Sequence, residues 1–529
     1  GLAHVVAVSG MHVAFLVGVL QSLLGKNRRS SLICICLVWL FAVMVGSPLS
    51  AIRAGIMISL LMLAPVLGRI NDRATTLSFA LALILVTNPF SAGSVALQLS
   101  FGAVAGMFLF SQPIYAYFSK KLSPPRIFRA VWNYIIATLS SSLAVTVFTF
   151  PLLAVHFGYI TLLAPVMNIL CLWAISLLFV GGFAVCAVGL VLPTPASWFA
   201  AVLSCLVRYI AFVVEYAAKL PVTALYMENK YAPAWLLTAY ALFIAYFLLR
   251  RKKKISVFAP SALCLAMLCG VFALTGRDMR SDTGTISVMD VGNGQCIAVT
   301  EGESVVVIDC GSYGVTQNAG SMLSSYLRAG GRYDIDYLML THLHSDHTTG
   351  VVRLLNLMNV NTVILPDNAE DTNGDNVLDD IIAACEENGT NIVYITRDTE
   401  FTAGAIRLSV YESSERGSRD ESGIMSTVSI GDYDMLVTGD VEKVVERELV
   451  SSHDLTDTEL LIVPHHGSKY STSDELLSEL RPETAVISTG YNRYGHPTKE
   501  TLDKLNEYGV NVLRTDELGR IVLHVASGD

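Results

Sequence analysis

The stretch THLHSDH, residues 341–347, decides how the second half of this chain folds. It follows an apolar run that is typical of a buried strand and precedes a helical stretch. Four potential metal ligands in six residues are hard to explain by packing. His342 and His344 are two positions apart, so they can face one metal ion, whereas Asp346 and His347 can turn toward a second. Imidazole and carboxylate ligands together suit zinc, manganese or iron.

Two further strand ends supply additional ligands for such a metal site. LVTGD at 436–440 places the carboxylate of Asp440 just past a strand, where it could bridge two cations. LIVPHHGS at 461–468 places two imidazoles in the same way, and at least one of His465 and His466 should be a ligand, with a slight preference for His465. The three segments together predict a cofactor of two divalent metal ions, Mn or Zn, or a single tightly bound ion.

The chain around these segments changes character near residue 285. Residues 285–529 alternate strand-like and helical stretches and carry 16 Lys and Arg against 40 Asp and Glu. A strand-rich α/β sandwich fits these residues as one domain. Residues 1–284 carry 20 Lys and Arg against only five Asp and Glu, and long apolar runs recur through them.

The composition of the whole chain excludes an ordinary soluble protein. It is 53% hydrophobic and 15% charged, against about 25% charged residues in a typical soluble domain. We predict a multi-pass α-helical membrane domain of about eight to ten helices at 1–276, a linker at 277–284 and the sandwich at 285–529. Because the chain starts at Gly1 rather than at Met, we also expect a preceding N-terminal part.

Lysine and arginine clusters in the short loops predict the orientation of the membrane domain. Clusters follow the first, third, fifth and ninth apolar runs, and the ninth run is followed by the sequence RRKKK at 250–254. If all of these clusters are cytoplasmic, the last run leads out of the cell, and the sandwich domain is extracytoplasmic.

Polar residues inside the apolar runs are costly and indicate a function. His4 and His12 lie eight positions apart on one helical face, Arg53 begins the third run, and Arg208 lies in a later run. These residues are candidates for a hydrated pathway between helices. The alternative is that they form buried hydrogen bonds or extend to the membrane surface.

The motifs HLHSDH, TGD and PHHGS resemble those of the metallo-β-lactamase superfamily. The whole chain resembles the ComEC family of competence proteins. The resemblance rests on five further stretches: GLAHVVAVSGMHV at 1–13, SAIRA at 50–54, QLSF at 98–101, MDVGNG at 289–294 and NRYGHP at 492–497. It implies a helical membrane domain followed by an αββα metallo-β-lactamase-like sandwich.

The same resemblance implies a function. A ComEC-like protein would sit in the bacterial plasma membrane as a channel for single-stranded DNA in natural transformation. Its extracytoplasmic domain would be a metal-dependent nuclease, a phosphodiesterase that degrades the strand that is not transported. The implied partners are DNA, a DNA receptor, a cytoplasmic helicase or ATPase, and a second copy of the chain. The chain itself has no P-loop sequence of its own.

Within that mechanism Asp346 and His496 are the candidate catalytic residues. Ser468 and Lys469 are candidate phosphate contacts, and Asp309 is a candidate support for the ligands. Two departures from the family pattern weaken the expectation of nuclease activity. Gln295 follows Gly294 where the family usually has an acidic residue, and residues 421–430 lack a histidine that the wider superfamily usually supplies.

Two other functions remain open. One is a DNA channel whose metallo-β-lactamase-like domain is a catalytically inactive gate. The other is a membrane-anchored metallo-hydrolase of a small molecule such as a lactone or thioester, although the chain has more apolar runs than an anchor needs.

Overall fold

The computed structural model describes residues 10–25, 27–46, 49–68, 72–121, 128–218, 220, 223–249, 258–279, 283–367, 376–412, 423–455 and 458–526. Contacts divide the chain into two compact units, Gly1–Met227 and Glu228–Asp529. We call them the first and the second unit. His4 lies outside the described residues.

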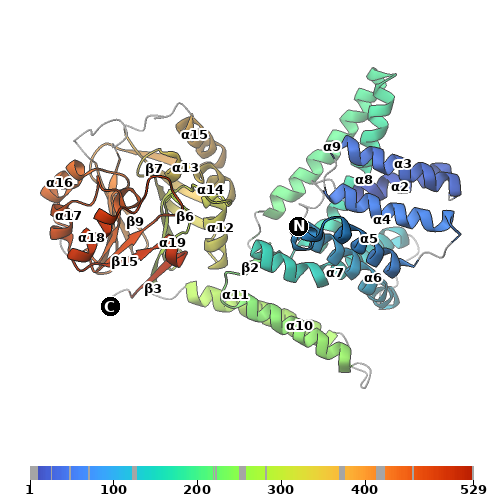
Figure 1. Ribbon diagram of the computed structural model, residues 1–529, viewed down its shortest axis with the longest axis horizontal. Coiled ribbons are helices and arrows are strands. Elements are labelled where there is room, and N and C mark those ends of the chain that lie inside the picture. The colour runs from blue at the N-terminus through green and yellow to red at the C-terminus, as the bar shows by residue number, and fades with distance from the viewer. Residues whose placement is uncertain are drawn as a thin grey trace. The chain divides into compact units, whose positions relative to one another are not determined.

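The first unit is helical (Figure 1). Its helices are α2 (Gly10–Leu24), α3 (Arg28–Met44), α4 (Leu49–Val66), α5 (Arg73–Thr87), η1 (Pro89–Gly93), α6 (Val95–Lys121), α7 (Arg129–Phe157), α8 (Ala164–Gly189) and α9 (Pro193–Ala218). Two short strands, β1 (Tyr159–Thr161) and β2 (Ala224–Tyr226), pair antiparallel.

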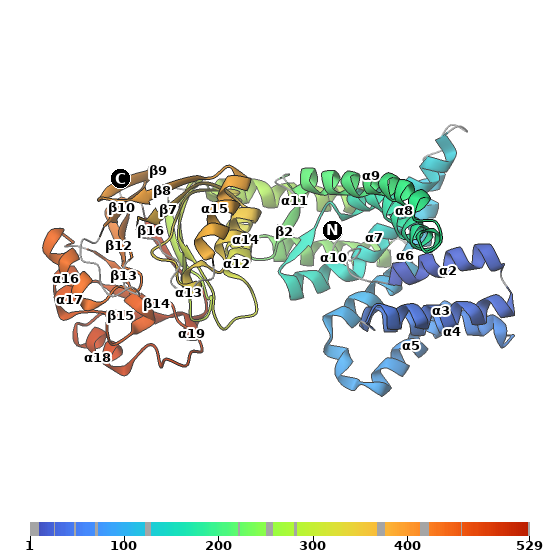
Figure 2. The same cartoon turned by 90° about the horizontal axis from the view of Figure 1, so that it is seen from above.

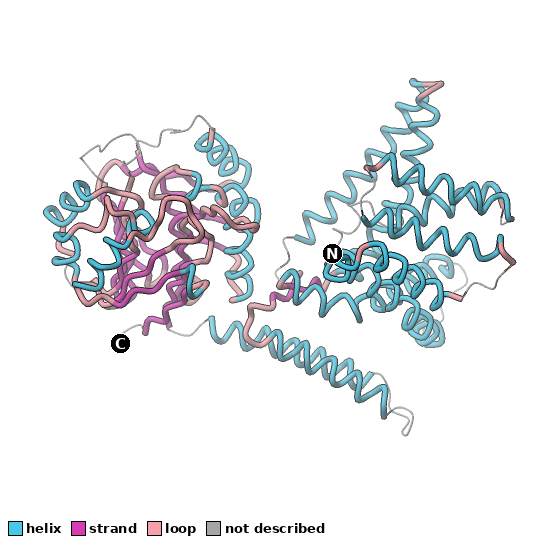
Figure 3. The backbone as a smooth tube through the Cα atoms, in the orientation of Figure 1, coloured by secondary structure: helices cyan, strands magenta, loops and turns pink. Residues whose placement is uncertain are grey.

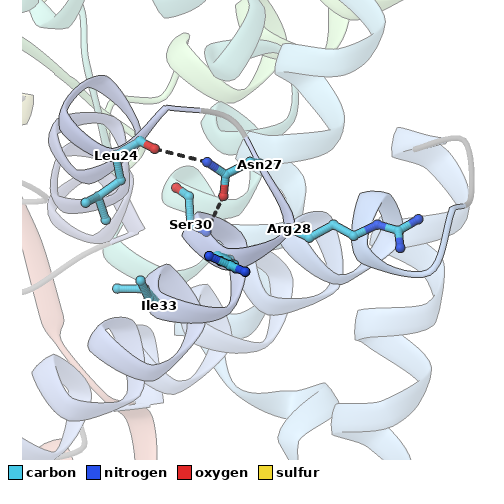
Figure 4. Close-up of a pocket in the computed structure, with 6 residues that line it drawn as sticks. Leu24, Asn27, Arg28, Ser30 and Ile33 are labelled. Atoms are coloured by element: carbon cyan, nitrogen blue, oxygen red, sulfur yellow. Dashed lines mark hydrogen bonds between the residues drawn. The ribbon is translucent and has the colours of Figure 1, made fainter.

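A capped turn between α2 and α3 illustrates how these apolar helices begin. The side chain of Asn27 accepts a hydrogen bond from the backbone N–H of Ser30 at 2.8 Å and donates one to the carbonyl oxygen of Leu24 at 3.2 Å. A pocket of about 440 Å³ opens beside this turn (Figure 4). The pocket is lined by Leu24, Asn27, Arg28, Arg29, Ser30 and Ile33.

Several described helices are long and apolar enough to cross a membrane. Six meet this condition by length and composition among the residues that the structure describes: α6, α7, α8 and α9 of the first unit, and α10 (Ala232–Leu249) and α11 (Phe258–Met279) of the second. Three shorter apolar helices lie at Gly10–Leu24, Ser50–Ala64 and Ala74–Thr87. The chain is therefore a membrane protein, and the figure of eight to ten crossings stays a prediction.

The last two apolar helices are joined to the sandwich by polar contacts, of which those of Asn229 are buried. The carboxamide of Asn229 donates to Thr275 Oγ1 at 2.7 Å and to the carbonyl oxygen of Ala329 at 2.8 Å. The guanidinium of Arg520 pairs with Glu228 and lies 4.6 Å from the ring centre of Tyr326. Since these bonds connect α10, α11 and the sandwich, all three fall in one compact unit.

The sandwich consists of two seven-stranded sheets (Figures 1 and 2). One sheet has the order β16-β3-β4-β5-β6-β7-β8. Its strands are β3 (Thr283–Val288), β4 (Cys296–Glu301), β5 (Ser304–Cys310), β6 (Asp334–Met339), β7 (Asn359–Pro366), β8 (Asn391–Ile395) and β16 (Ile521–Ala526).

The other sheet has the order β15-β14-β13-β12-β11-β10-β9. Its strands are β9 (Thr399–Ala403), β10 (Ile406–Tyr411), β11 (Met425–Ile430), β12 (Tyr433–Val437), β13 (Leu460–Ile462), β14 (Thr484–Ile487) and β15 (Asn511–Arg514). The sheets are joined and covered by α12 (Ala319–Ala329), α13 (Ser345–Thr348), α14 (Val351–Leu357), α15 (Val377–Asn388), α16 (Lys443–Ser452), η3 (Pro464–Gly467), α17 (Asp474–Leu480), α18 (Lys499–Glu507) and α19 (Thr515–Leu518).

The alternation of apolar side chains along the strands explains the four layers. In β5, Val306 and Ile308 point into the core between the two sheets, while Val305 and Val307 point into a core shared with α12, α14 and α15. In β12, Leu436 points the other way, into a third core shared with α16, α17 and α18. Figure 3 shows the two strand layers between these helical layers. The predicted αββα sandwich after a helical membrane domain is therefore confirmed.

The strand directions bring several loops to one edge of the sandwich. Strands β5, β6, β7 and β8 run parallel, and so do β12, β13, β14 and β15. The carboxyl ends of parallel strands meet at the same edge of a sheet, which is where open α/β sheets bind ligands. Of the second-unit residues singled out from the sequence, Asp309 lies at the end of β5 and the others follow β6, β12, β13 and β14.

Candidate metal centre

Four of the predicted ligands lie together at this edge. Ligand atoms of Asp346, His347, Asp440 and His466 all lie within 4.8 Å of one another. His347 Nε2 is 3.2 Å from Asp440 Oδ1, and His466 Nε2 is 3.3 Å from Asp346 Oδ2. The residues lie in the segments that follow β6, β12 and β13, with Asp346 and His347 in α13 and His466 in η3, so both sheets contribute.

A second group shares one carboxylate with the first. Ligand atoms of His342, His344 and Asp440 also lie within 4.8 Å of one another. His342 Nε2 is 3.8 Å from Asp440 Oδ2, and His465 Nε2 is 3.8 Å from the same oxygen. The structure thus brings together all seven predicted ligands, with Asp440 common to both groups. His466, rather than the slightly preferred His465, belongs to the first group.

Backbone geometry at three positions allows these side chains to converge. Gly439, just before Asp440, has φ +62°, and a Cβ there would lie 2.8 Å from the Cβ of Thr341. Only glycine therefore lets the end of β12 approach the end of β6 so closely. His465 and His466 have φ values of +51° and +53°, a region that few non-glycine residues adopt. This strained turn directs both imidazoles toward the edge, and such strain is concentrated at functional sites.

Asp309 stabilises the segment that carries the ligands His342 to His347. Its fully buried carboxylate accepts hydrogen bonds from the backbone N–H of Thr341 at 2.8 Å, from Thr341 Oγ1 at 2.8 Å and from Gln295 Nε2 at 2.9 Å. Its Oδ2 is also 2.8 Å from His347 Nδ1. Because this contact occupies Nδ1 of His347, Nε2 is the nitrogen that faces Asp440.

Sequence reasoning missed two of these supporting residues, Thr341 and Gln295. Thr341 anchors Asp309 and also lies 3.0 Å from His342 Nδ1 through its hydroxyl. The backbone N–H of Gln295 donates to the carbonyl oxygen of Asp346 at 3.0 Å. The signal for Gln295 was present, since it directly follows the glycine-rich turn at 292–294, but its partner Asp309 lies 14 positions away.

Burial and neighbouring charges shift the protonation of the ligands. Burial, followed by the nearby His347, lowers the pKa of His342 to about 3, so its imidazole is neutral near pH 7. Burial raises the pKa of Asp346, but the His466 and His347 imidazoles together outweigh it and bring the value to about 2. Burial likewise raises the pKa of Asp440, and the opposing effect of His347 places it well below the usual range. Both carboxylates are therefore ionised.

The donor set fits divalent cations. Nε2 of His347 and Nε2 of His466 are buried, and neither forms a hydrogen bond with any of the described residues. Each instead faces a carboxylate oxygen at 3.2–3.3 Å. Buried imidazole nitrogens and ionised carboxylates directed at one point are the ligands that zinc and manganese sites use. The first group could hold one ion and the second group another.

The remaining predicted residues lie at varying distances from this centre. The ring of His496 is 5.5 Å from that of His465, centre to centre. Ser468 is buried just after the strained turn, and Lys469 is exposed with its Nζ 5.0 Å from the ring centre of Tyr470. Neither Ser468 nor Lys469 belongs to either ligand group.

The predicted pathway residues of the first unit occupy different surroundings. His12 in α2 packs against Phe179, with ring centres 5.0 Å apart. Arg53 in α4 is buried, and its Nε forms no hydrogen bond with the described residues. Arg208 in α9 is exposed. The pathway therefore stays a prediction.

Comparison with known proteins agrees with this description. Residues 1–254 match the family described as Competence protein, and residues 289–378 match the metallo-beta-lactamase superfamily. The chain is 27% identical over 546 residues to ComE operon protein 3 of Bacillus subtilis (strain 168), covering 98% of this chain and 67% of that protein. It is 25% identical over 553 residues to competence protein ComA of Neisseria gonorrhoeae, covering 100% of this chain and 71% of that protein.

Among solved structures, the chain is similar to CmlA, a diiron beta-hydroxylase from Streptomyces venezuelae, with a TM-score of 0.32 and 14% identity over 46% of this chain and 55% of that one. The matches to the competence family and to the metallo-β-lactamase superfamily fall on the helical region and on the sandwich respectively. The chain therefore carries a competence-protein domain at residues 1–254 and a metallo-β-lactamase domain in its second half, and it is similar to competence proteins over nearly its whole length.

Proposed function

We propose that this protein is a membrane channel for the uptake of single-stranded DNA whose extracytoplasmic metal-dependent nuclease degrades the other strand. Its similarity to competence proteins supports a role in DNA uptake, and its metallo-β-lactamase domain supports a metal-dependent hydrolase. The observation that carries the nuclease is the pair of ligand groups that share Asp440. Two-metal sites of this kind suit in-line displacement at a phosphodiester.

The residues of this chain would have distinct roles in metal binding and hydrolysis. The first group and the second group would each hold a divalent ion, and the bound ions would acidify a water molecule and stabilise the leaving oxygen. Asp309 would keep Nε2 of His347 directed at the centre. His496, at the outer side of His465, is placed to contact a phosphate or to give a proton to the leaving group.

The positions of the helices support an extracytoplasmic nuclease. Among the described residues, four membrane-length helices, α7 to α10, lie between the basic sequence ending at Arg129 and the basic sequence at 250–254. An even number of crossings returns the chain to the same side, and cytoplasmic loops are the ones enriched in Lys and Arg. One further crossing by α11 would then place the sandwich outside the cell. In this proposal a surface receptor delivers DNA and a cytoplasmic helicase or ATPase draws the strand in.

A direct test uses the full chain in detergent with linear DNA. We expect Mn²⁺ or Zn²⁺ to support cleavage and chelation with EDTA to abolish it, with DNA length measured on a gel. Metal-dependent hydrolysis of a lactone or thioester with DNA left intact would favour the small-molecule hydrolase. Bound but intact DNA at all metal concentrations would favour an inactive gate.

A second prediction concerns the passage of DNA through the membrane domain. Arg53 is 7% exposed in an apolar helix, and a buried guanidinium there can contact a phosphate. We expect Arg53→Ala to lower uptake of labelled DNA by about tenfold, equivalent to ~1.4 kcal/mol, at unchanged protein level in the membrane. Arg53→Lys, which keeps the charge, should retain most of the uptake. Normal uptake in Arg53→Ala would remove Arg53 from the pathway.

A further inference from the structure

A file of three rings leads from the metal centre to the surface of the second unit. His465 Nε2 lies 3.8 Å from Asp440 Oδ2, the rings of His465 and His496 are 5.5 Å apart, and those of His496 and Tyr494 are 5.9 Å apart at an interplanar angle of 30°. The exposed fraction of the side chain rises from 9% for Asp440 to 37% for His465, and Tyr494 is 71% exposed. We call His465, His496 and Tyr494 the ring file. It runs outward from the ligands.

The loop that carries the outer two rings is held by one side chain. Asn492 Oδ1 accepts hydrogen bonds from the backbone N–H of Tyr494 at 3.1 Å and from that of His496 at 3.0 Å. Asn492 Nδ2 donates to the carbonyl oxygens of His496 at 2.7 Å and Gly490 at 2.9 Å. Four hydrogen bonds therefore fix the loop while Tyr494 stays largely in solvent. A ring held in place but exposed is ready to bind a flat partner at a low entropic cost.

Three more exposed tyrosines lie in loops at the same edge of the sandwich. Tyr491 is 90% exposed, Tyr470 58% and Tyr313 56%. The loop of Tyr313 reaches that of Tyr491, since a Cβ on Gly314 would lie 3.4 Å from the carbonyl oxygen of Tyr491. Two cations accompany them: Lys469 is 5.0 Å from the ring centre of Tyr470, and Arg493, between the two loop tyrosines, is exposed.

Aromatic faces with a few cations match the chemistry of unpaired nucleobases. Proteins bind single strands by stacking successive bases on aromatic side chains and by contacting the phosphates with basic ones. Bases in a duplex are already stacked and paired, so their faces are not available to a tyrosine. Residues 285–529 carry 40 acidic against 16 basic residues, so long-range attraction of phosphate cannot provide the affinity. Base stacking must therefore provide the affinity for the strand.

We infer that the ring file, extended by Tyr491, binds unpaired nucleobases and thereby places the adjoining phosphodiester of a single strand at the metal centre. This inference rests on the proposed function, because it takes DNA as the substrate. It adds that the strand is recognised as single-stranded, by its bases, before it is cut. Tyr494 is a binding residue in this account, and the ligand groups remain responsible for hydrolysis.

The test measures binding without cleavage. The full chain in detergent, kept free of metal by EDTA, is titrated against a fluorescent 12-residue oligothymidylate, and anisotropy reports the affinity. We expect Tyr494→Ala to weaken binding about tenfold, since one stacked base is worth roughly 1–3 kcal/mol. Tyr494→Phe, which keeps the ring, should bind nearly as well as the wild type. Tyr394→Ala, a 42% exposed tyrosine on β8, is the matched control and should bind as the wild type.

The salt dependence and a duplex of equal length provide further readouts. With Lys469 and Arg493 as the two phosphate contacts, the slope of log affinity against log salt should be about −1.4. The duplex should bind more weakly than the single strand, and Tyr494→Ala should not change its affinity. Wild-type affinity in Tyr494→Ala, an equally large loss in Tyr494→Phe, or equal losses for duplex and single strand would each overturn the inference.

The result also separates this inference from the nuclease proposal. If the protein binds single strands through Tyr494 but does not cut DNA with added metal, the ring-file inference is supported and the nuclease proposal is wrong. If the wild type and Tyr494→Ala cut DNA equally well and bind single strands equally well, the nuclease proposal is supported and the ring-file inference is wrong.

Discussion

Asp440→Asn is expected to remove both metal ions and to lower DNA cleavage by about 10³-fold, equivalent to ~4 kcal/mol of lost transition-state stabilisation. Asp440 is the one carboxylate common to the two ligand groups. It lies 3.2 Å from His347 and 3.8 Å from both His342 and His465. The amide has the same size as the carboxylate but lacks its charge, so the substitution removes the shared ligand with little change in packing.

The measurement is metal content by mass spectrometry of the purified full chain, together with gel-based cleavage. Asp432→Asn is the matched control, because Asp432 is exposed in the turn at the other end of β12. The control should keep two ions and full cleavage. If Asp440→Asn retained both ions, or lost both and still cut DNA at the wild-type rate, the shared-carboxylate centre would be wrong.

Asp309→Asn is expected to weaken metal binding by about 10–100-fold, the usual effect of losing a partner that orients a ligand. The carboxylate accepts two hydrogen bonds from Thr341 and one from Gln295, and it contacts His347 Nδ1 at 2.8 Å. An amide has one acceptor oxygen for these donors, and its N–H₂ group would face another donor. Asparagine tolerates the φ of +55° at this position, so backbone strain does not change.

Calorimetric titration of the full chain with Mn²⁺ measures this effect. Asp336→Asn is the control: Asp336 also accepts a backbone hydrogen bond, from Val305 at 2.9 Å between the same two strands, but it lies at the start of β6, away from the ligands. Unfolding in urea shows whether both variants remain folded. Equal metal affinity in Asp309→Asn and the wild type would mean that His347 needs no support from Asp309.

Much of the fold and of the centre could be predicted from residue types at strand ends. The seven predicted ligands follow β6, β12 and β13. Parallel pairing brings the strand ends within each sheet to one edge, and the packing of the two sheets brings the two edges together. The choice between His465 and His466 could not be made, because it depends on two successive residues with positive φ in the turn after β13. Neither residue type signals that conformation.

The supporting contacts were hidden for a different reason. Gln295 reaches Asp309 because β4 and β5 pair across a bulge near Cys296, and a register irregularity of this kind leaves no periodic trace in a sequence.

The helices of the first unit show what hydropathy cannot predict. Gly10–Leu24 and Ala74–Thr87 are apolar but shorter than a typical span, so composition alone does not fix how many helices cross.

Anomalous X-ray diffraction from crystals of the full chain grown with Mn²⁺ would locate the ions themselves. Two peaks are expected about 3.5–4 Å apart. One should lie among Asp346, His347 and His466, the other beside His342 and His344, with Asp440 in contact with both. A single peak, or peaks away from the ends of β6, β12 and β13, would contradict a two-metal centre built from these strands.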